Sequence, residues 1–195
     1  KRKDSNLIGQ CGVGSANNGG GTDGEEFNLQ AGTSASAGSF IYVASESTGF
    51  TTFFGFAPDF TSGALAINGD DAVELFCDGE VIDVFGDINT DGTGQPWEYM
   101  DGWAARKANS TVNGGVYNAD EWVFSGKNAL DGATSNATAD TAIPVQTFTQ
   151  SVSLFITGAV DGSLSGGIPK AIEIYTNNFL FFLKVMLLSS SIKEI

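Results

Sequence analysis

The chain has 195 residues, enough for one domain, or for one domain and a piece of a second, with a hydrophobic core of its own. Nine Lys and Arg residues stand against 23 Asp and Glu residues, and the resulting formal net charge of −14 argues against binding to a phosphate backbone. Histidine is absent, which excludes Ser-His-Asp and Cys-His catalysis and histidine zinc sites. We therefore expect a protein that is not an enzyme.

The start of the chain suggests a fragment, because it begins with Lys1 rather than methionine and shows no secretory signal peptide. Only 16% of the residues are charged, and small polar residues with many glycines give a composition typical of secreted proteins. We expect an extracellular or cell-surface location. Cys11 and Cys77 cannot complete a four-thiolate zinc site. They form either one disulfide, in an oxidising compartment, or two unpaired thiols, and the sequence favours neither.

Strand signals dominate the chain up to residue 175. A loop is predicted over residues 12–26, because so many glycines would weaken a strand interior. Asp78-Gly79 between two apolar runs predicts a β-hairpin, since both turn residues must tolerate positive φ. No sustained helical period appears before the C-terminal tail. The pattern predicts an all-β antiparallel sandwich with strands near residues 40–44, 72–76, 81–85, 122–124, 152–160 and 171–175.

Residues 87–98 fit the calcium-loop pattern D-x-[DN]-x-[DN]-G-x5-E at every specified position. Oxygens from the first, third and fifth positions can converge on a hard cation, Gly92 permits the sharp turn, and the closing glutamate can bind through both oxygens. A strand rather than a helix precedes the loop, so a solvated β-turn is the alternative. The predicted Ca²⁺ ligands are Asp87, Asn89, Asp91, Thr93 through its carbonyl, Gln95 directly or through water, and Glu98.

Other candidate groups have structural interpretations that we favour. The acidic run at residues 68–71 is interpreted as a turn before a strand. Arg106-Lys107 is expected to pair with nearby acids rather than to bind nucleic acid. A glycan-stacking face could be built from four aromatic residues, although core packing is the favoured interpretation for Trp97, Tyr99, Trp103 and Tyr117.

The C-terminal residues 179–188 are strongly apolar but too few to span a bilayer, which needs roughly 20 such residues. We interpret residues 179–195 as a tail foreign to the domain. The alternative is an amphipathic membrane anchor, although the segment lacks the basic face that such anchors use.

Several segments together resemble the bacterial lamin-tail domain family. They are the predicted central hairpin at residues 69–76 and 78–86 and the aromatic stretches at residues 97–99, 101–106 and 122–132. The resemblance covers residues 12–145. It implies an immunoglobulin-like antiparallel β-sandwich. It also implies a module of secreted or surface proteins, sometimes beside nuclease or phosphoesterase domains, with no catalytic residues of its own.

The order of the segments departs from that family. The hairpin that opens such domains resembles residues 154–160 and 169–175, here joined by a long glycine-rich turn, and in this chain it comes last. A tandem-repeat fragment or a circular permutation would give this order. The predicted divisions are a sandwich lacking its opening hairpin at residues 1–150, that hairpin at residues 151–178, and the tail at residues 179–195. Because a sandwich without these strands exposes edges and core, residues 152–175 are expected to fold back or to pair with a neighbouring chain or repeat.

The sequence therefore predicts a non-catalytic, extracellular structural or adhesive module, with calcium as a candidate stabilising ion. The alternative is an accessory module that targets an attached secreted nuclease or phosphoesterase to its substrate or to the cell surface. A protein or cell-surface glycan would be its partner, with no nucleic acid bound by the module and no membrane span.

Overall fold

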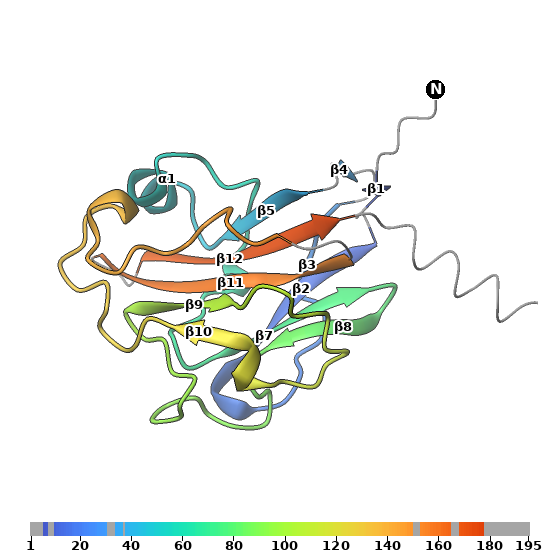
Figure 1. Cartoon of the computed structure of the whole chain (residues 1–195). Coiled ribbons are helices and arrows are strands. Elements are labelled where there is room, and N and C mark those ends of the chain that lie inside the picture. The colour runs from blue at the N-terminus through green and yellow to red at the C-terminus, as the bar shows by residue number, and fades with distance from the viewer. Residues whose placement is uncertain are drawn as a thin grey trace, which may run out of the picture.

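The computed structural model describes residues 6–7, 10–30, 34–36, 38–149, 153–164 and 168–177. Two β-sheets face each other across a hydrophobic core (Figure 1). The prediction of an all-β sandwich is confirmed. Among the described residues, no helix is long and apolar enough to cross a membrane. The predicted tail, residues 179–195, lies outside the described residues.

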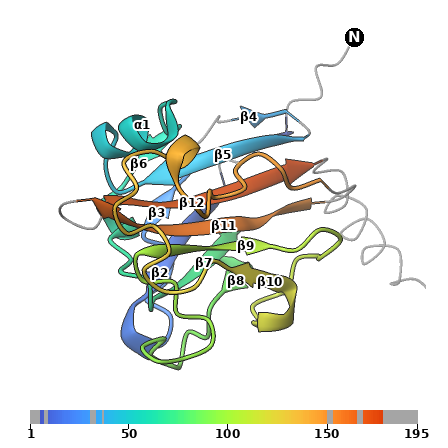
Figure 2. The ribbon, with the colours of Figure 1, turned by 60° about the vertical axis from the view of Figure 1, so that its left-hand side comes forward.

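The larger sheet has six strands, and the two at its centre come last in the chain (Figure 2). Its strands are, in spatial order, β10 (Trp122–Phe124), β9 (Gly102–Arg106), β11 (Ser153–Leu164), β12 (Ile168–Asn177), β5 (Ser39–Ala44) and β6 (Phe60–Thr61). Neighbours run antiparallel except β5 and β6, which are parallel. β11 pairs with β9 and β12 pairs with β5, so the late hairpin folds back into its own chain.

The smaller sheet has four antiparallel strands, in the order β3 (Phe27–Asn28), β2 (Cys11–Ala16), β7 (Ala72–Cys77) and β8 (Glu80–Phe85). β7 and β8 form the hairpin predicted from Asp78-Gly79, and both residues have positive φ, at 53° and 81°. Cys11 and Cys77 are directly opposite each other on β2 and β7 and form a disulfide. A separate two-stranded pair joins β1 (Asn6–Leu7) to β4 (Ser34–Ala35).

The predicted loop at residues 12–26 is wrong for its first part, because residues 11–16 form β2. Gly12 and Gly14 allow neighbouring backbone segments to approach the strand closely, and they do not mark a loop. A Cβ atom added to Gly12 would overlap the Phe27 carbonyl oxygen, and one added to Gly14 would overlap the Gly24 carbonyl oxygen. Glycine in a strand interior marks such a site of close backbone approach.

The predicted glycine-rich turn at residues 161–169 is also shorter than expected. β11 continues to Leu164 and β12 begins at Ile168. Asp161 and Lys170 are cross-strand partners whose carboxylate and ammonium groups lie 2.7 Å apart. Asp161 and the further partners Leu164 and Ile168 lie in the segment that the sequence pattern assigned to the turn.

Alternation along the strands directs one set of apolar side chains between the sheets. Val73 and Leu75 of β7 are fully buried there, facing Ile172 and Ile174 of β12 in the same core. Phe85 contacts the Tyr99 and Trp122 rings, with centroids 5.2 and 4.6 Å away. Burial of one aliphatic or aromatic side chain of this size contributes about 1.5–3 kcal/mol, so this inner layer is the main source of stability.

A second apolar layer lies on the outer face of the six-stranded sheet. Helix α1 (Thr48–Phe54) places Phe50 and Phe53 against that face, beside Tyr42 of β5. The sequence pattern did not predict this helix, because seven residues give only two turns of apolar period. The other helical segments of the described residues are single 3-10 turns, η1 (Asn17–Gly19), η2 (Gly63–Leu65), η3 (Ala119–Glu121) and η4 (Asn136–Thr138).

Candidate functional site

The predicted calcium loop follows β8, and its first two acids each close a local turn. The Asp87 carboxylate accepts hydrogen bonds from the Asn89 N–H at 3.0 Å and the Thr90 hydroxyl at 2.8 Å. The Asp91 carboxylate accepts one from the Thr93 N–H at 2.9 Å, and this bond lowers the pKa of Asp91. Turns of this kind form when an aspartate bonds to the backbone two residues on, and they need no cation.

The closing residue of the loop, Glu98, is directed to a lysine. Its carboxylate accepts a bond from the Lys127 ammonium at 2.7 Å and another from the Gly94 N–H at 2.9 Å. The Lys127 hydrogen bond is the main reason that the pKa of Glu98 is lowered, and the Gly94 N–H adds to it. Glu98 is therefore ionised at neutral pH, with its charge already compensated.

The other predicted ligands lie on the exposed side of the loop. The Thr93 hydroxyl donates to the Asp70 carboxylate at 2.6 Å, and the Gln95 N–H donates to the Gly92 carbonyl at 2.8 Å. Within the described ranges, no three acidic, cysteine or histidine side chains gather as a metal site would require. The structure thus places the predicted ligands in one loop without directing their carboxylates to a common point, and calcium binding stays a prediction.

A surface hollow of about 300 Å³ borders this loop. Asp87 and Asn89 line one side, and Val116, which is 72% exposed, lines another together with Tyr117. The Tyr117 hydroxyl is buried and has no hydrogen-bond partner among the described residues, and burial raises its pKa. The other predicted stacking residues, Trp97, Tyr99 and Trp103, are at most 8% exposed, which agrees with the interpretation as core residues.

A buried ion pair connects the two sheets. Asp83 of β8 and Arg106 of β9 form two N–H···O bonds of 2.8 Å, and both side chains are fully buried. The same groups hold the backbone of Ile156 on β11, because Asp83 accepts from its N–H at 2.9 Å and Arg106 donates to its carbonyl at 2.8 Å. Burial raises the pKa of Asp83 to about 6, while Arg106 and backbone N–H groups oppose the rise. Arg106 does pair with acids, as its sequence context suggested.

Asn113 covers the outer edge of β8. Its side-chain amide accepts from the Val84 N–H at 3.0 Å and donates to the Val84 carbonyl at 2.7 Å, as a neighbouring strand would. The next residue adds a bond from the Gly114 N–H to the Ile82 carbonyl at 3.1 Å. Open strand edges invite pairing with other chains, and this loop therefore protects the longest edge strand.

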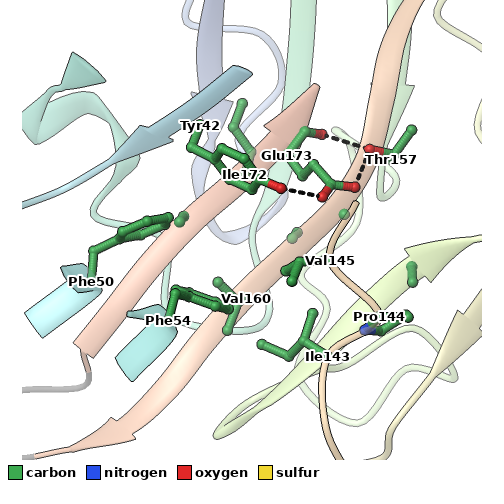
Figure 3. A pocket seen from close by; sticks show the side chains of 14 residues that line it. Tyr42, Phe50, Phe54, Ile143, Pro144, Val145, Thr157, Val160, Ile172 and Glu173 are labelled. Atoms are coloured by element: carbon green, nitrogen blue, oxygen red, sulfur yellow. Dashed lines mark hydrogen bonds between the residues drawn. The ribbon is translucent and has the colours of Figure 1, made fainter. Parts of the chain in front are cut away.

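A second buried carboxylate, Glu173 of β12, lies under the outer apolar layer (Figure 3). It accepts hydrogen bonds from the Tyr42 hydroxyl at 2.8 Å, the Thr157 hydroxyl at 2.6 Å and the Gln146 N–H at 2.8 Å. Burial raises its pKa, and these three donors oppose the rise.

The cavity beside Glu173 has a volume of about 20 Å³, room for about one water molecule. Its walls are mostly apolar and include Phe50, Phe54, Ile143, Val145, Val160 and Ile172 (Figure 3). A space this small and apolar fits a packing defect in the outer layer better than a substrate site.

Sequence reasoning did not select Asp83, Asn113 or Glu173. Asp83 is an acid inside an apolar strand run, and that misplaced charge was the one local signal of a buried partner. Glu173 carries the same signal between Ile172 and Ile174. Asn113 carried none, because asparagine before glycine is common in turns.

Comparison of the chain with protein-family models, with curated proteins and with solved structures finds no match.

Proposed function

We propose that the chain is a non-catalytic structural or adhesive module that acts outside the cell, of the lamin-tail type with an immunoglobulin-like sandwich. The use of the buried ionisable side chains carries this proposal. Five of them bond to backbone groups elsewhere in the chain, namely Asp71, Asp83, Arg106, Asp161 and Glu173. The exception is Glu74, whose Oε2 is buried without a hydrogen-bond partner among the described residues. Groups used in this way stabilise the fold and are not presented to a substrate.

The disulfide supports the extracellular location. The Cα atoms of Cys11 and Cys77 lie 4.0 Å apart on paired strands, and disulfides persist in oxidising compartments. The net charge of −14 suits a soluble surface in salt and divalent cations.

The full chain coupled to beads tests the module function. We expect the beads to be retained on cell-surface or polysaccharide preparations, with no turnover of phosphodiester, phosphomonoester or glycoside substrates in magnesium or calcium. Turnover that accompanies the chain through purification would overturn the non-catalytic assignment. Beads that are not retained would overturn the adhesive role and leave the structural role.

Calcium is proposed as a weak stabilising ion of the loop at residues 87–98. The oxygen-rich sequence supports this, and the bond between Glu98 and Lys127 limits the affinity because calcium must displace the lysine. Extracellular calcium modules bind at about 10⁻⁴–10⁻³ M. Calorimetric titration should show binding in that range, lost in Asp87→Ala and in Glu98→Ala. Equal heats in the wild type and in both variants would contradict it.

The alternative function is a binding module that targets an attached nuclease or phosphoesterase. The hollow between Asp87 and Tyr117 favours it, because an aromatic ring beside polar oxygens suits a sugar. A glycan array with two variants tests this sugar site. Binding that is lost in Tyr117→Ala and kept in the exposed control Val123→Ala would support the alternative.

A further inference from the structure

The late hairpin fills a space that the rest of the chain leaves open. β12 pairs with β5 from Ala171↔Ala44 to Thr176↔Ser39, and β11 pairs with β9 from Gly158↔Ala105 to Asp161↔Gly102. Without the hairpin, β9 and β5 would not be neighbours, and the inner apolar layer would lose Ile156, Ile172 and Ile174. The body of the module therefore needs a hairpin to complete its larger sheet.

The body holds that hairpin through specific polar contacts on both faces of the sheet. On the inner face, Asp83 and Arg106 bond to both backbone groups of Ile156. On the outer face, Tyr42 and the Gln146 N–H bond to Glu173. A buried charge or N–H group that loses such a partner is costly. The Ile156 contacts use backbone groups that any paired strand offers, whereas the Glu173 contacts require its side chain, so the outer face selects for a hairpin of this sequence.

Other routes for pairing with a second chain are closed or short in the described part of the molecule. Asn113 covers β8, while the other edge strands have only two or three residues, namely β3, β6 and β10. Strand exchange at the centre of the sheet is therefore better supported than addition at an edge.

The order of synthesis also favours exchange. In the chain, the hairpin follows the other described strands of the sandwich, since β11 begins at Ser153, after β10 and η4. The body is thus made before its own hairpin, with the acceptor space open to any copy nearby. Closed and exchanged forms make the same contacts except in the connection, so concentration and tethering decide between them.

We propose that the space between β9 and β5 is a hairpin-acceptor site, and that its partner is the β11–β12 hairpin of a second copy of this chain. This rests on the proposed structural or adhesive function and names the partner, another copy of the module itself. Modules that exchange hairpins are joined without any further binding surface.

Single cysteines on two differently tagged full chains test the exchange. Ser39→Cys is placed on one chain and Thr176→Cys on the other, because these hydroxyl groups lie 3.5 Å apart across β5 and β12. The chains are unfolded without reductant, refolded together over a range of concentrations and treated with a short bifunctional maleimide. We expect an interchain product that increases with concentration and is several-fold above a control pair of Val123→Cys with Thr176→Cys. Val123 is exposed on β10, which β9 and β11 separate from β12.

One chain carrying both Ser39→Cys and Thr176→Cys reports the closed form and should crosslink within itself. Mixed single variants that give no more product than the control pair would overturn the proposal. A wild-type chain that is purely monomeric in light scattering after concentrated refolding would do the same. Either failure leaves the tests of the proposed function unchanged, whereas failure of the proposed function appears as substrate turnover.

Discussion

Asp83 of the body and Glu173 of the late hairpin are both buried carboxylates that link the hairpin to the body, but they are compensated differently. Asp83 lies between the sheets against a guanidinium, with two bonds of 2.8 Å. Glu173 lies under the outer layer and receives bonds from two hydroxyl groups and one N–H. Removing the cation that pairs with Asp83 leaves a buried charge without a partner. The donors around Glu173, in contrast, need acceptor oxygens rather than a charge. The inner site therefore depends on electrostatics and the outer site on hydrogen-bond geometry.

Arg106→Ala should have the largest effect on stability. It leaves the Asp83 carboxylate buried without its cation and the Ile156 carbonyl without its donor, so we expect a loss of about 3–5 kcal/mol in the free energy of unfolding. Urea denaturation measures it. The matched variant Arg106→Lys keeps the charge but lacks the guanidinium that donates to both the Asp83 carboxylate and the Ile156 carbonyl. Its free energy of unfolding should lie between those of the wild type and Arg106→Ala. If Arg106→Ala is as stable as the wild type, the ion pair does not stabilise the fold.

Glu173→Ala should cost less, about 1–3 kcal/mol, because it orphans neutral donors in a partly buried site. Glu173→Gln is its control. The amide oxygen can accept from Tyr42 and Gln146, and the amide nitrogen can donate to the Thr157 hydroxyl, which can turn to the Glu173 backbone carbonyl at 3.3 Å. We expect Glu173→Gln to be as stable as the wild type, or more so. Equal losses in both variants would mean that the site needs the charge.

The pH dependence sharpens the difference further. Burial raises the folded-state pKa of Glu173, so the folded state binds its proton more tightly than the unfolded chain. Its contribution to stability is complete below the unfolded pKa, near 4.3, and is lost as the pH rises through the folded pKa. Thermal unfolding should therefore show a higher Tm at pH 5 than at pH 8, with a smaller difference in Glu173→Gln. The assignment would be contradicted if the Tm of the wild type falls between pH 8 and pH 5 and the Tm of Glu173→Gln changes by the same amount.

The smallest effect is expected at the surface pair of Glu98 and Lys127. The Lys127 side chain is 45% exposed, so Lys127→Ala should change stability by less than about 1 kcal/mol, and by less still in high salt. The same variant removes the group that competes for the Glu98 carboxylate. Calcium should therefore bind Lys127→Ala more tightly than it binds the wild type. Calorimetry on both proteins checks this, and weaker binding in Lys127→Ala would contradict the competition.

Local sequence patterns predicted much of the fold, but few of the hydrogen bonds and ion pairs made by buried polar side chains. The β7–β8 hairpin follows from Asp78-Gly79 between apolar runs, which acts within a few residues. The link between Asp83 and Arg106 spans 23 residues, and the link between Asp83 and Ile156 spans 73. No short-range pattern reports such partners. The acids of the predicted calcium loop were easy to find, but their hydrogen bonds depend on Lys127 and on local turn geometry.

By itself, the sequence determined the class of structure, because alternating apolar residues and glycine turns leave little besides packed sheets. It also determined the negative charge and the lack of histidine chemistry. Only the tertiary structure decided that the last two strands lie at the centre of the larger sheet, that Cys11 and Cys77 pair, and which buried acids meet a cation. The reason is physical: strand formation is governed by neighbours in the chain, whereas strand order and charge pairing are settled by contacts between segments distant in sequence.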